Sequence, residues 1–511
     1  MAHRIFSGAL ALALALICCC PSGDARAQAQ ARKAPELDGG VAWFNADRPV
    51  KMADLKGKVV LLDFWTFCCI NCMHVIPDLQ RLERKYAKEL VVIGVHSAKF
   101  ENEKDSESIR QAILRYDIEH PVVNDAEFAI WNKFGAKAWP FFVLIDPEGN
   151  IIGTASGEGQ YEMFVRAIDE QIKKFDAKLN REELKFGSER SKVKPGALAF
   201  PGKILATADR LFIADTKHHR IVVTDHAGKV LDTVGGPDLG NKDGDFTTAR
   251  FNEPQGMALK GSVLYVCDRQ NHLIRQIDFG AKIVTTIAGT GKQLSHMAGG
   301  PALSTGLNSP WDVALDQDRL LIAMAGNHQI WALDPAKATI GPISGDGREN
   351  ILDGPHARAE FSQPSGLSIQ GGKAYVADSE ISAVREVDLE ANGRVRTIVG
   401  TGLFKFGDKD GIGDDVLLQH CIGLTWHNGT LYLADSYNHK IKTVDPKTRT
   451  VRTFLGDGKK GYQDGPRPRF HEPNGLAGWG DKLFIADTNN HAIRVCDLKT
   501  GNVTTLPVEL K

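Results

Sequence analysis

Residues 63–72 read Asp-Phe-Trp-Thr-Phe-Cys-Cys-Ile-Asn-Cys, so three of the chain's nine cysteines fall within five positions. The mostly apolar run 58–64 predicts a buried strand. Residues 72–89 predict a helix, because apolar side chains recur there at the spacing of one helical face. Cys69 and Cys72 therefore lie at a strand-to-helix junction, one helical turn apart.

This junction supplies the groups that thiol–disulfide exchange requires. Free backbone N–H groups at the start of the helix favour the thiolate form of Cys69, and Cys72 is close enough to attack a mixed disulfide formed there. Asp63, near the end of the strand, would have a raised pKa when buried and could accept the proton of Cys72. A cis proline at Pro140, before the apolar strand 141–145, would lie beside the thiols. We therefore predict a catalytic site built from Cys69, Cys72, Asp63 and Pro140.

The region from about Glu36 to Lys174 resembles the thioredoxin fold. The resemblance extends to Pro77, which stands where thioredoxin-like helices carry a kinking proline. The extra strand and helix expected between residues 97 and 134 resemble the insertion of the exported TlpA-like and redoxin branches. The resemblance implies a redox-active cysteine pair, Cys69 and Cys72.

Three departures from the thioredoxin pattern bear on the chemistry. Cys68 replaces the tryptophan that usually precedes the first cysteine, and it offers a third thiol that could form an alternative disulfide or modulate the nucleophile. Ile70-Asn71 stands in place of Gly-Pro, so the reduction potential of thioredoxins does not carry over. Trp139 is bulky and could narrow the substrate groove beside Pro140. We treat Cys68 and Trp139 as accessory residues.

After residue 194 the helical periodicity gives way to a repeat. Six short apolar segments return at intervals of about 50 residues. They are residues 211–215, 264–268, 320–324, 374–378, 431–435 and 483–487. Further strand patterns follow each segment, giving about four short strands per unit. Such units cannot bury both faces alone, so they predict a six-bladed β-propeller.

Two polar positions recur in these units. Asp ends the apolar segment in five copies and His follows four residues later in five copies, with Met324 and Ser382 as the exceptions. We expect each Asp and His to hydrogen-bond to one another as a structural staple rather than to bind a metal. The units resemble NHL repeats from about Gly196 to Lys511, although Cys421 stands where a proline usually leads into the blade.

The thioredoxin-like domain, the Cys-Cys-Ile-Asn-Cys sequence at 68–72 and the NHL propeller together resemble the NHL repeat-containing protein 2 family over nearly the whole mature chain. We therefore expect an α/β thioredoxin-like fold followed by an all-β six-bladed NHL β-propeller. The expected activity is that of a thiol–disulfide oxidoreductase, with a protein thiol or disulfide as substrate and a redox partner protein. The propeller would recruit a protein or peptide on the face where its connecting loops gather.

Two other interpretations concern the cysteine region itself. The thioredoxin-like domain could be degenerate, in which case both domains form a non-catalytic scaffold for protein interactions. Thr66-x-x-Cys69 is also a feature of peroxide-reducing sites, but Leu62 occupies the position of the proline expected upstream. Both remain alternatives to the oxidoreductase.

Metal sites are less favoured by the pattern. Copper(I) prefers thiolate and imidazole ligands, and the domain that contains Cys68 and Cys72 also has three candidate histidines. These histidines are His74, His96 and His120. A cis proline at Pro140 would crowd such a set of ligands. The acidic loop 408–415 resembles a calcium-binding loop in its spacing of Asp residues. Gln419 stands where an EF-hand loop has its closing glutamate, so the EF-hand interpretation fails. We expect no metal and no cofactor beyond the redox-active disulfide.

The start of the chain has the pattern of an export signal. A short basic segment precedes the apolar run 5–17, and Ala25-Arg26-Ala27 is typical of a cleavage site. The run is shorter than the roughly 20 residues that a spanning helix needs, and cysteines 18–20 lack the small residue that precedes a lipoprotein anchor. We expect an exported protein, periplasmic or otherwise extracytoplasmic, with no membrane span after cleavage.

Composition fits two folded domains. A chain of 511 residues exceeds a single core, and its net charge of −1 gives no reason to expect nucleic acid as a partner. We divide it into a signal peptide (1–27), a thioredoxin-like domain (28–176), a linker (177–195) and a propeller (196–511).

Overall fold

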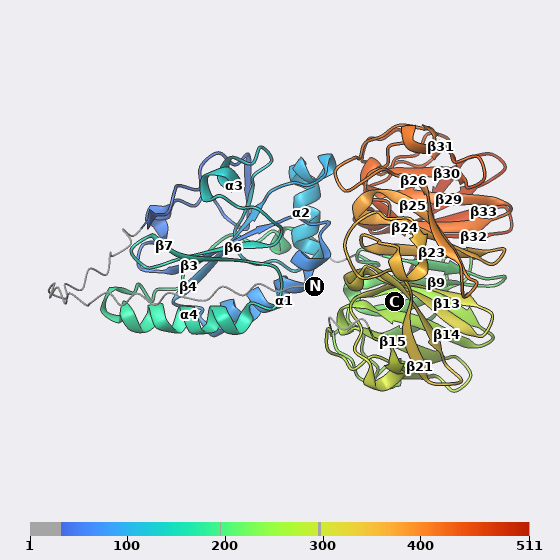
Figure 1. Cartoon of the computed structure of the whole chain (residues 1–511), viewed down its shortest axis with the longest axis horizontal. Coiled ribbons are helices and arrows are strands. Elements are labelled where there is room, and N and C mark those ends of the chain that lie inside the picture. The colour runs from blue at the N-terminus through green and yellow to red at the C-terminus, as the bar shows by residue number, and fades with distance from the viewer. Residues whose placement is uncertain (1–31, 195, 295–297, 510–511) are drawn as a thin grey trace, which may run out of the picture.

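The structure is a computed structural model that describes residues 32–194, 196–294 and 298–509, so the expected signal peptide lies outside the described residues. An α/β domain and a β-propeller lie side by side, with α1 and α2 reaching toward the propeller (Figure 1). Across the described ranges, no helix combines the length and apolar character needed to cross a membrane.

The first domain is built on a seven-stranded mixed sheet in the order β1-β7-β6-β3-β4-β5-β2. Its strands are β1 (Arg32–Lys33), β2 (Ala42–Phe44), β3 (Val59–Trp65), β4 (Leu90–His96), β5 (Val122–Asn124), β6 (Phe141–Ile145) and β7 (Asn150–Ser156). β3 lies parallel to β4 and antiparallel to β6, and every residue of β3 is buried. Such complete burial explains why this strand is apolar almost throughout.

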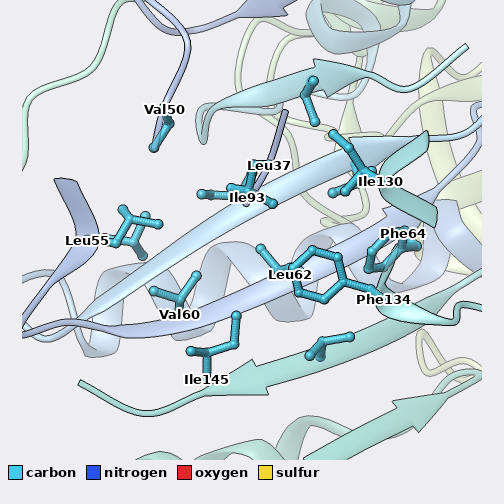
Figure 2. Packing of buried hydrophobic residues seen from close by; sticks show 14 of the residues in the cluster. Leu37, Val50, Leu55, Val60, Leu62, Phe64, Ile93, Ile130, Phe134 and Ile145 are labelled. Atoms are coloured by element: carbon cyan, nitrogen blue, oxygen red, sulfur yellow. The ribbon is translucent and has the colours of Figure 1, made fainter. Parts of the chain in front are cut away.

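Four helices cover the sheet: α1 (Ile70–Lys85), α2 (Ser106–Arg115), α3 (Ala129–Phe134) and α4 (Tyr161–Lys174). α1 and α4 pack on one face. On the other face, Leu62, Phe64 and Ile93 of the sheet pack with Ile130 and Phe134 of α3 (Figure 2). α1 begins at Ile70, earlier than the predicted start at Cys72.

The second domain is a propeller of six small antiparallel sheets, which confirms the predicted fold class. Blade 1 comprises β8 (Ile204–Ala206), β9 (Leu211–Asp215), β10 (Arg220–Thr224) and β11 (Val230–Gly235). Blade 2 comprises β13 (Pro254–Lys260), β14 (Val263–Asp268), β15 (Leu273–Asp278) and β16 (Ile283–Ala288), with the short β12 (Gly244–Asp245). Blade 3 comprises β18 (Pro310–Asp316), β19 (Arg319–Met324), β20 (Gln329–Asp334) and β21 (Thr339–Ser344), with the short β17 (Gly300–Pro301).

Blade 4 comprises β23 (Pro364–Gln370), β24 (Lys373–Asp378), β25 (Ala383–Asp388) and β26 (Arg394–Val399), with the short β22 (Gly354–Pro355). Blade 5 comprises β28 (Gly423–His427), β29 (Thr430–Asp435), β30 (Lys440–Asp445) and β31 (Thr450–Leu455), with the short β27 (Gly411–Ile412). Blade 6 comprises β32 (Pro473–Trp479), β33 (Lys482–Asp487), β34 (Ala492–Asp497) and β35 (Val503–Thr505). The last blade meets the first, where Gly475 N donates to Gly202 O at 2.9 Å.

The recurring Asp and His stabilise the ring, but not as predicted. Each Asp bonds to the segment that leads into its own blade, as Asp268 Oδ1 does by accepting from Asn252 N at 2.7 Å. Each His instead bonds to the corresponding segment of the next blade, as His272 Nδ1 does by accepting from Ser309 N at 3.0 Å. The predicted Asp–His hydrogen bond is therefore wrong, because the His ring reaches across to the neighbouring blade.

Residues that depart from the repeat keep the same connections. Ser382 Oγ accepts from His420 N at 3.0 Å, as a His does elsewhere. Met324 Sδ lies 3.4 Å from Asn308 N, in the place of an Asp oxygen.

His491 Nδ1 accepts from Phe200 N at 3.1 Å and so joins the last blade to the first.

Candidate thiol site at the domain interface

The cysteine loop lies between the end of β3 and the start of α1. Cys69 is the N-cap residue of α1, with an extended backbone, and its carbonyl accepts from Met73 N at 3.1 Å. All three cysteines are buried, and Cys69, at 9% exposure, is the least buried of them. All three are free thiols. Cys69 is therefore the thiol of this group that solvent reaches most easily.

The predicted proline lies beside this thiol. The Trp139–Pro140 peptide bond is cis, and the Cys69 Sγ lies 3.7 Å from the Trp139 carbonyl oxygen. The Trp139 indole donates to Ser97 O at 2.9 Å and packs against Trp131, with 4.7 Å between ring centroids. The fold thus brings Cys69, Trp139 and Pro140 together.

Asp63 and Cys72 are both buried, and the charge of Asp63 acts on the Cys72 thiol. Burial raises the pKa of Asp63 to about 7, although the nearby His120 acts in the opposite direction. Burial also raises the pKa of the Cys72 thiol, with further contributions from Cys69 and from the charge of Asp63. Asp63 Oδ1 has no hydrogen-bond partner among the described residues. A carboxyl with this pKa can exchange a proton with its surroundings near neutral pH.

Cys68 lies in a buried charged cluster formed by both domains. Its backbone N–H donates to Glu103 Oε1 at 2.8 Å, and its Sγ lies 3.8 Å from Glu380 Oε1 of the propeller. Lys99 Nζ donates to the same Glu380 oxygen at 2.5 Å. Burial raises the pKa of the Cys68 thiol, and Glu103 and Glu380 raise it further. Cys68 is therefore held in its protonated form.

The propeller also contacts the cysteine loop through its backbone. Ile70 N donates to Gln363 Oε1 at 2.9 Å, and Gln363 Nε2 donates to Cys68 O at 2.9 Å. Next to these bonds, Ile70 and Met73 of α1 pack against Trp311 and Ala325 of the propeller. The thiol site is consequently part of the interface between the domains.

Contacts farther along α1 and α2 extend this interface. His74 of α1 bonds to Ser309 Oγ through Nε2 at 2.6 Å and to Glu158 Oε1 through Nδ1 at 2.9 Å. Asn102 Nδ2, just before α2, donates to Glu472 Oε1 at 2.9 Å. Tyr437 packs against Phe67 and Phe100.

Sequence reasoning missed the propeller residues of this interface. Several of them occupy one position that recurs in every blade. In blades 2, 3, 4 and 6 it directly precedes the proline that begins the innermost strand, and its backbone is left-handed in each blade. The residues at this position, here called docking-ring residues, have φ between 47° and 62° and are Phe200, Glu253, Ser309, Gln363, His420 and Glu472. Ser309, Gln363, His420 and Glu472 contact the first domain directly. The available signal was that this position varies in residue type while the surrounding pattern repeats.

The structure does not gather the candidate metal ligands into one site. Within the described ranges no group of three or more His, Cys, Asp or Glu side chains is arranged to hold a metal ion. His74 bonds to Glu158 and Ser309, and the nitrogens of His96 have no partner among the described residues. In the acidic loop, Asp408 pairs with Lys440 and Lys442.

Thr66, the residue behind the peroxidase alternative, is also engaged. Its hydroxyl donates to Glu103 Oε2 at 2.6 Å. The same carboxylate oxygen accepts from the backbone N–H groups of Lys99 and Phe100. The hydroxyl is thus directed toward Glu103, and its role in this structure is to support the loop before Cys68.

Comparisons with known proteins agree with this architecture. Residues 57–151 match the thioredoxin-like family, and residues 307–333 match the NHL repeat. The Bacillus subtilis thiol-disulfide oxidoreductase YkuV is 27% identical over 136 residues, which cover 26% of this chain and 90% of that protein. The likeness to YkuV is therefore confined to the first domain.

Two longer relatives match both domains. SUPPRESSOR OF QUENCHING 1 of Arabidopsis thaliana, described as chloroplastic, is 43% identical over 509 residues, covering 94% of this chain and 48% of that protein. NHL repeat-containing protein 2 of Gallus gallus is 43% identical over 519 residues, covering 93% of this chain and 71% of that protein. With its thioredoxin-like domain, Cys-Cys-Ile-Asn-Cys loop and propeller, the chain belongs to the NHL repeat-containing protein 2 family.

Proposed function

We propose that this protein is a thiol–disulfide oxidoreductase that uses Cys69 as nucleophile and Cys72 as resolving cysteine. The observation that carries the proposal is the position of Cys69, at the N-terminus of α1 and 3.7 Å from the carbonyl before Pro140. A helix N-terminus stabilises a thiolate. Cys72 follows within the first turn of the same helix, where a Cys69–Cys72 disulfide can form.

In the reducing direction, Cys69 attacks one sulfur of a substrate disulfide. The substrate S–S bond breaks, a mixed disulfide with Cys69 forms, and the other substrate sulfur leaves as a thiolate. Cys72 then loses its proton and attacks the Cys69 sulfur, which releases the second substrate thiolate and leaves a Cys69–Cys72 disulfide. Two electrons pass to the substrate, and a dithiol partner protein restores the site by the same exchange. Oxidation of a substrate dithiol is the reverse sequence.

Asp63 is the proposed proton acceptor for Cys72. The pKa of the Cys72 thiol is raised by burial, so the thiol needs a base before it can attack. Asp63 has a pKa of about 7 and an oxygen without a partner among the described residues. General bases act most effectively when their pKa lies near the working pH. Asp63 therefore matches the resolving step.

We further propose an exported protein whose propeller recruits a protein substrate. The apolar run 5–17 with Ala25-Arg26-Ala27 supports export. A propeller presents loops from all its blades on one face, which favours binding of a protein or peptide. Identification of the N-terminal residue of the mature protein, and of the compartment that holds it, tests the first part: a mature chain beginning near residue 28 is expected.

The function is tested by glutathione redox titration of the mature protein, with thiols counted by mass spectrometry. Wild-type protein and Cys68→Ser should show a reversible two-electron couple, and Cys69→Ser should lack it. Cys68 is the matched control because it is an adjacent buried thiol. A couple that survives Cys69→Ser, or that disappears in Cys68→Ser, would reject the assigned pair.

The alternative is a non-catalytic interaction protein. The observation that favours it is burial: Cys69 retains 9% of its exposure, and a propeller side chain bonds to the backbone on either side of it. A scaffold predicts no reversible couple in the titration above, and no loss of partner binding when Cys69 and Cys72 are both replaced by Ser.

A further inference from the structure

Gln363 of the propeller bonds to the peptide groups on both sides of the candidate nucleophile. Its Oε1 accepts from Ile70 N and its Nε2 donates to Cys68 O, both at 2.9 Å. The orientation of the amide follows from these partners, because a backbone N–H can only donate and a carbonyl can only accept. One side chain thus spans the cysteine loop at Cys69.

Gln363 itself has little freedom to move. Its side chain is almost fully buried, and its backbone has a left-handed φ of 62°. The backbone N–H donates to His328 Nδ1 at 3.0 Å, which is the His staple from the preceding blade. Its side-chain amide is therefore presented to the cysteine loop from a backbone that the propeller holds in place.

The bond to Ile70 has a defined place in α1. The first N–H groups of a helix have no partner within the helix, and an N-cap side chain usually provides one. Cys69 occupies the N-cap position but provides no such bond. Gln363, from the other domain, accepts from the first helical N–H group at Ile70, while the Cys69 thiol faces the Trp139 carbonyl.

Other docking-ring residues contact different parts of the first domain. Ser309 bonds to His74, and Glu472 bonds to Asn102 and lies 3.4 Å from Arg115. Within the described ranges, Gln363 is the propeller residue whose side chain bonds to the backbone of residues 68–70. Its contact with the thiol site is therefore separate from the general docking of the domains.

We propose that Gln363 is a positioning residue of the thiol pair, through which the propeller sets the stability of the dithiol form. The proposal rests on the proposed thiol–disulfide function. Both Gln363 bonds fix the peptide groups beside Cys69 in a structure with free thiols. We infer that closing the Cys69–Cys72 disulfide weakens these bonds, and a contact favours one state by as much as it is stronger there. Their loss should favour the Cys69–Cys72 disulfide.

The test compares Gln363→Met with Glu472→Met in the full mature chain. Gln363→Met keeps the side-chain length and removes both bonds to the loop, whereas Glu472→Met removes docking-ring contacts with Asn102 and Arg115. The loss of two hydrogen bonds should shift the glutathione exchange equilibrium of Gln363→Met about tenfold toward the disulfide, which corresponds to a potential about 30 mV more negative. Glu472→Met should remain within twofold of wild type.

Hydrogen–deuterium exchange gives a second readout that does not depend on turnover. The Ile70 amide should exchange at least about tenfold faster in Gln363→Met than in wild type. In Glu472→Met it should exchange at the wild-type rate. An unchanged potential in Gln363→Met, or equal shifts in both variants, would overturn the positioning role while leaving the proposed function intact. A wild-type protein without a reversible couple would overturn the function, and the positioning role with it.

Discussion

Buried carboxylates lie in both domains, but the two groups differ in how completely they are partnered. Asp268 of the propeller accepts from Asn252 N at 2.7 Å and pairs with Arg275 at 2.8 Å. The same pairing recurs as Asp378–Arg385 and Asp487–Arg494. Asp63 of the first domain is also buried, yet its Oδ1 has no partner among the described residues.

This difference separates structural from chemical roles. A buried polar group usually has a full set of hydrogen-bond partners, and the repeated Asp of the propeller follows that rule. A single acid that is desolvated, incompletely partnered and close to thiols is instead typical of a functional site. The structural aspartates of the propeller can be recognised because they repeat in the sequence, whereas Asp63 occurs once, outside any repeat.

The largest effect should come from breaking a repeated ion pair. Arg275→Met leaves Asp268 and Asp243 without their buried cation, which should lower the free energy of unfolding by about 3–5 kcal/mol. Urea unfolding followed by circular dichroism measures this loss. The control is Lys499→Met, which removes an exposed pair with Asp481 and should cause no measurable change. Equal stability of both variants would show that the repeated pairs do not stabilise the propeller.

The contribution of Asp63 to the pH dependence of stability should appear as the difference between wild type and Asp63→Asn, because burial also raises the pKa of Asp268, Asp378 and Asp487, to about 6. Below about pH 4 the Asp63 carboxyl is protonated in both the folded and the unfolded chain, so its contribution is fully present. As the pH rises to about 7, the unfolded chain loses this proton while the folded chain keeps it, and stability falls by up to roughly 4 kcal/mol. Asp63→Asn should lack this decline and should be the more stable protein at pH 8. Parallel urea midpoints for both proteins from pH 4 to 8 would contradict the assignment.

The same substitution should slow the proposed exchange although it stabilises the fold. Without a base, the attack of Cys72 on a mixed disulfide at Cys69 should become about 100-fold slower at pH 7. Rapid-quench mass spectrometry of the mixed disulfide measures this step. Asp169→Asn, on the exposed side of α4, is the control and should leave the rate unchanged. A normal rate in Asp63→Asn would exclude Asp63 as the base.

The smallest effect concerns a blade that departs from the repeat. Ser382→Ala removes the acceptor of the His420 backbone N–H and should cost about 1 kcal/mol of unfolding free energy. Ser304→Ala, at an exposed position in blade 3, should leave the free energy of unfolding unchanged. A cost no greater than that of Ser304→Ala would mean that the blade 4–5 junction does not depend on this staple.

Local patterns predicted most of the fold. The strand before Cys69 and the apolar periodicity after it are short-range signals, and the propeller was visible because six similar segments repeat. The predicted Asp–His bond was wrong for a physical reason. A period identifies equivalent positions, but it does not tell whether His272 bonds within its blade or, as observed, to Ser309 of the next.

The interface was beyond the reach of those signals. Gln363 and Glu380 lie about 300 positions from the cysteine loop, and no local pattern connects them with it. The thiols and Asp63 were identifiable because a single strand, turn and helix brings them together, and Pro140 because it directly precedes the apolar strand 141–145. The propeller's share of the site depends on how two separate folds meet, which requires the tertiary structure.

The bond from Phe200 to His491 removes the distinction between terminal and internal blades. In a linear repeat array the end units have one neighbour and unfold first. Here every blade has two neighbours, so opening any one of them disrupts two junctions at once. The ring should therefore lose its structure in a single cooperative step, and a thiol site that depends on blade 4 should disassemble in that same step.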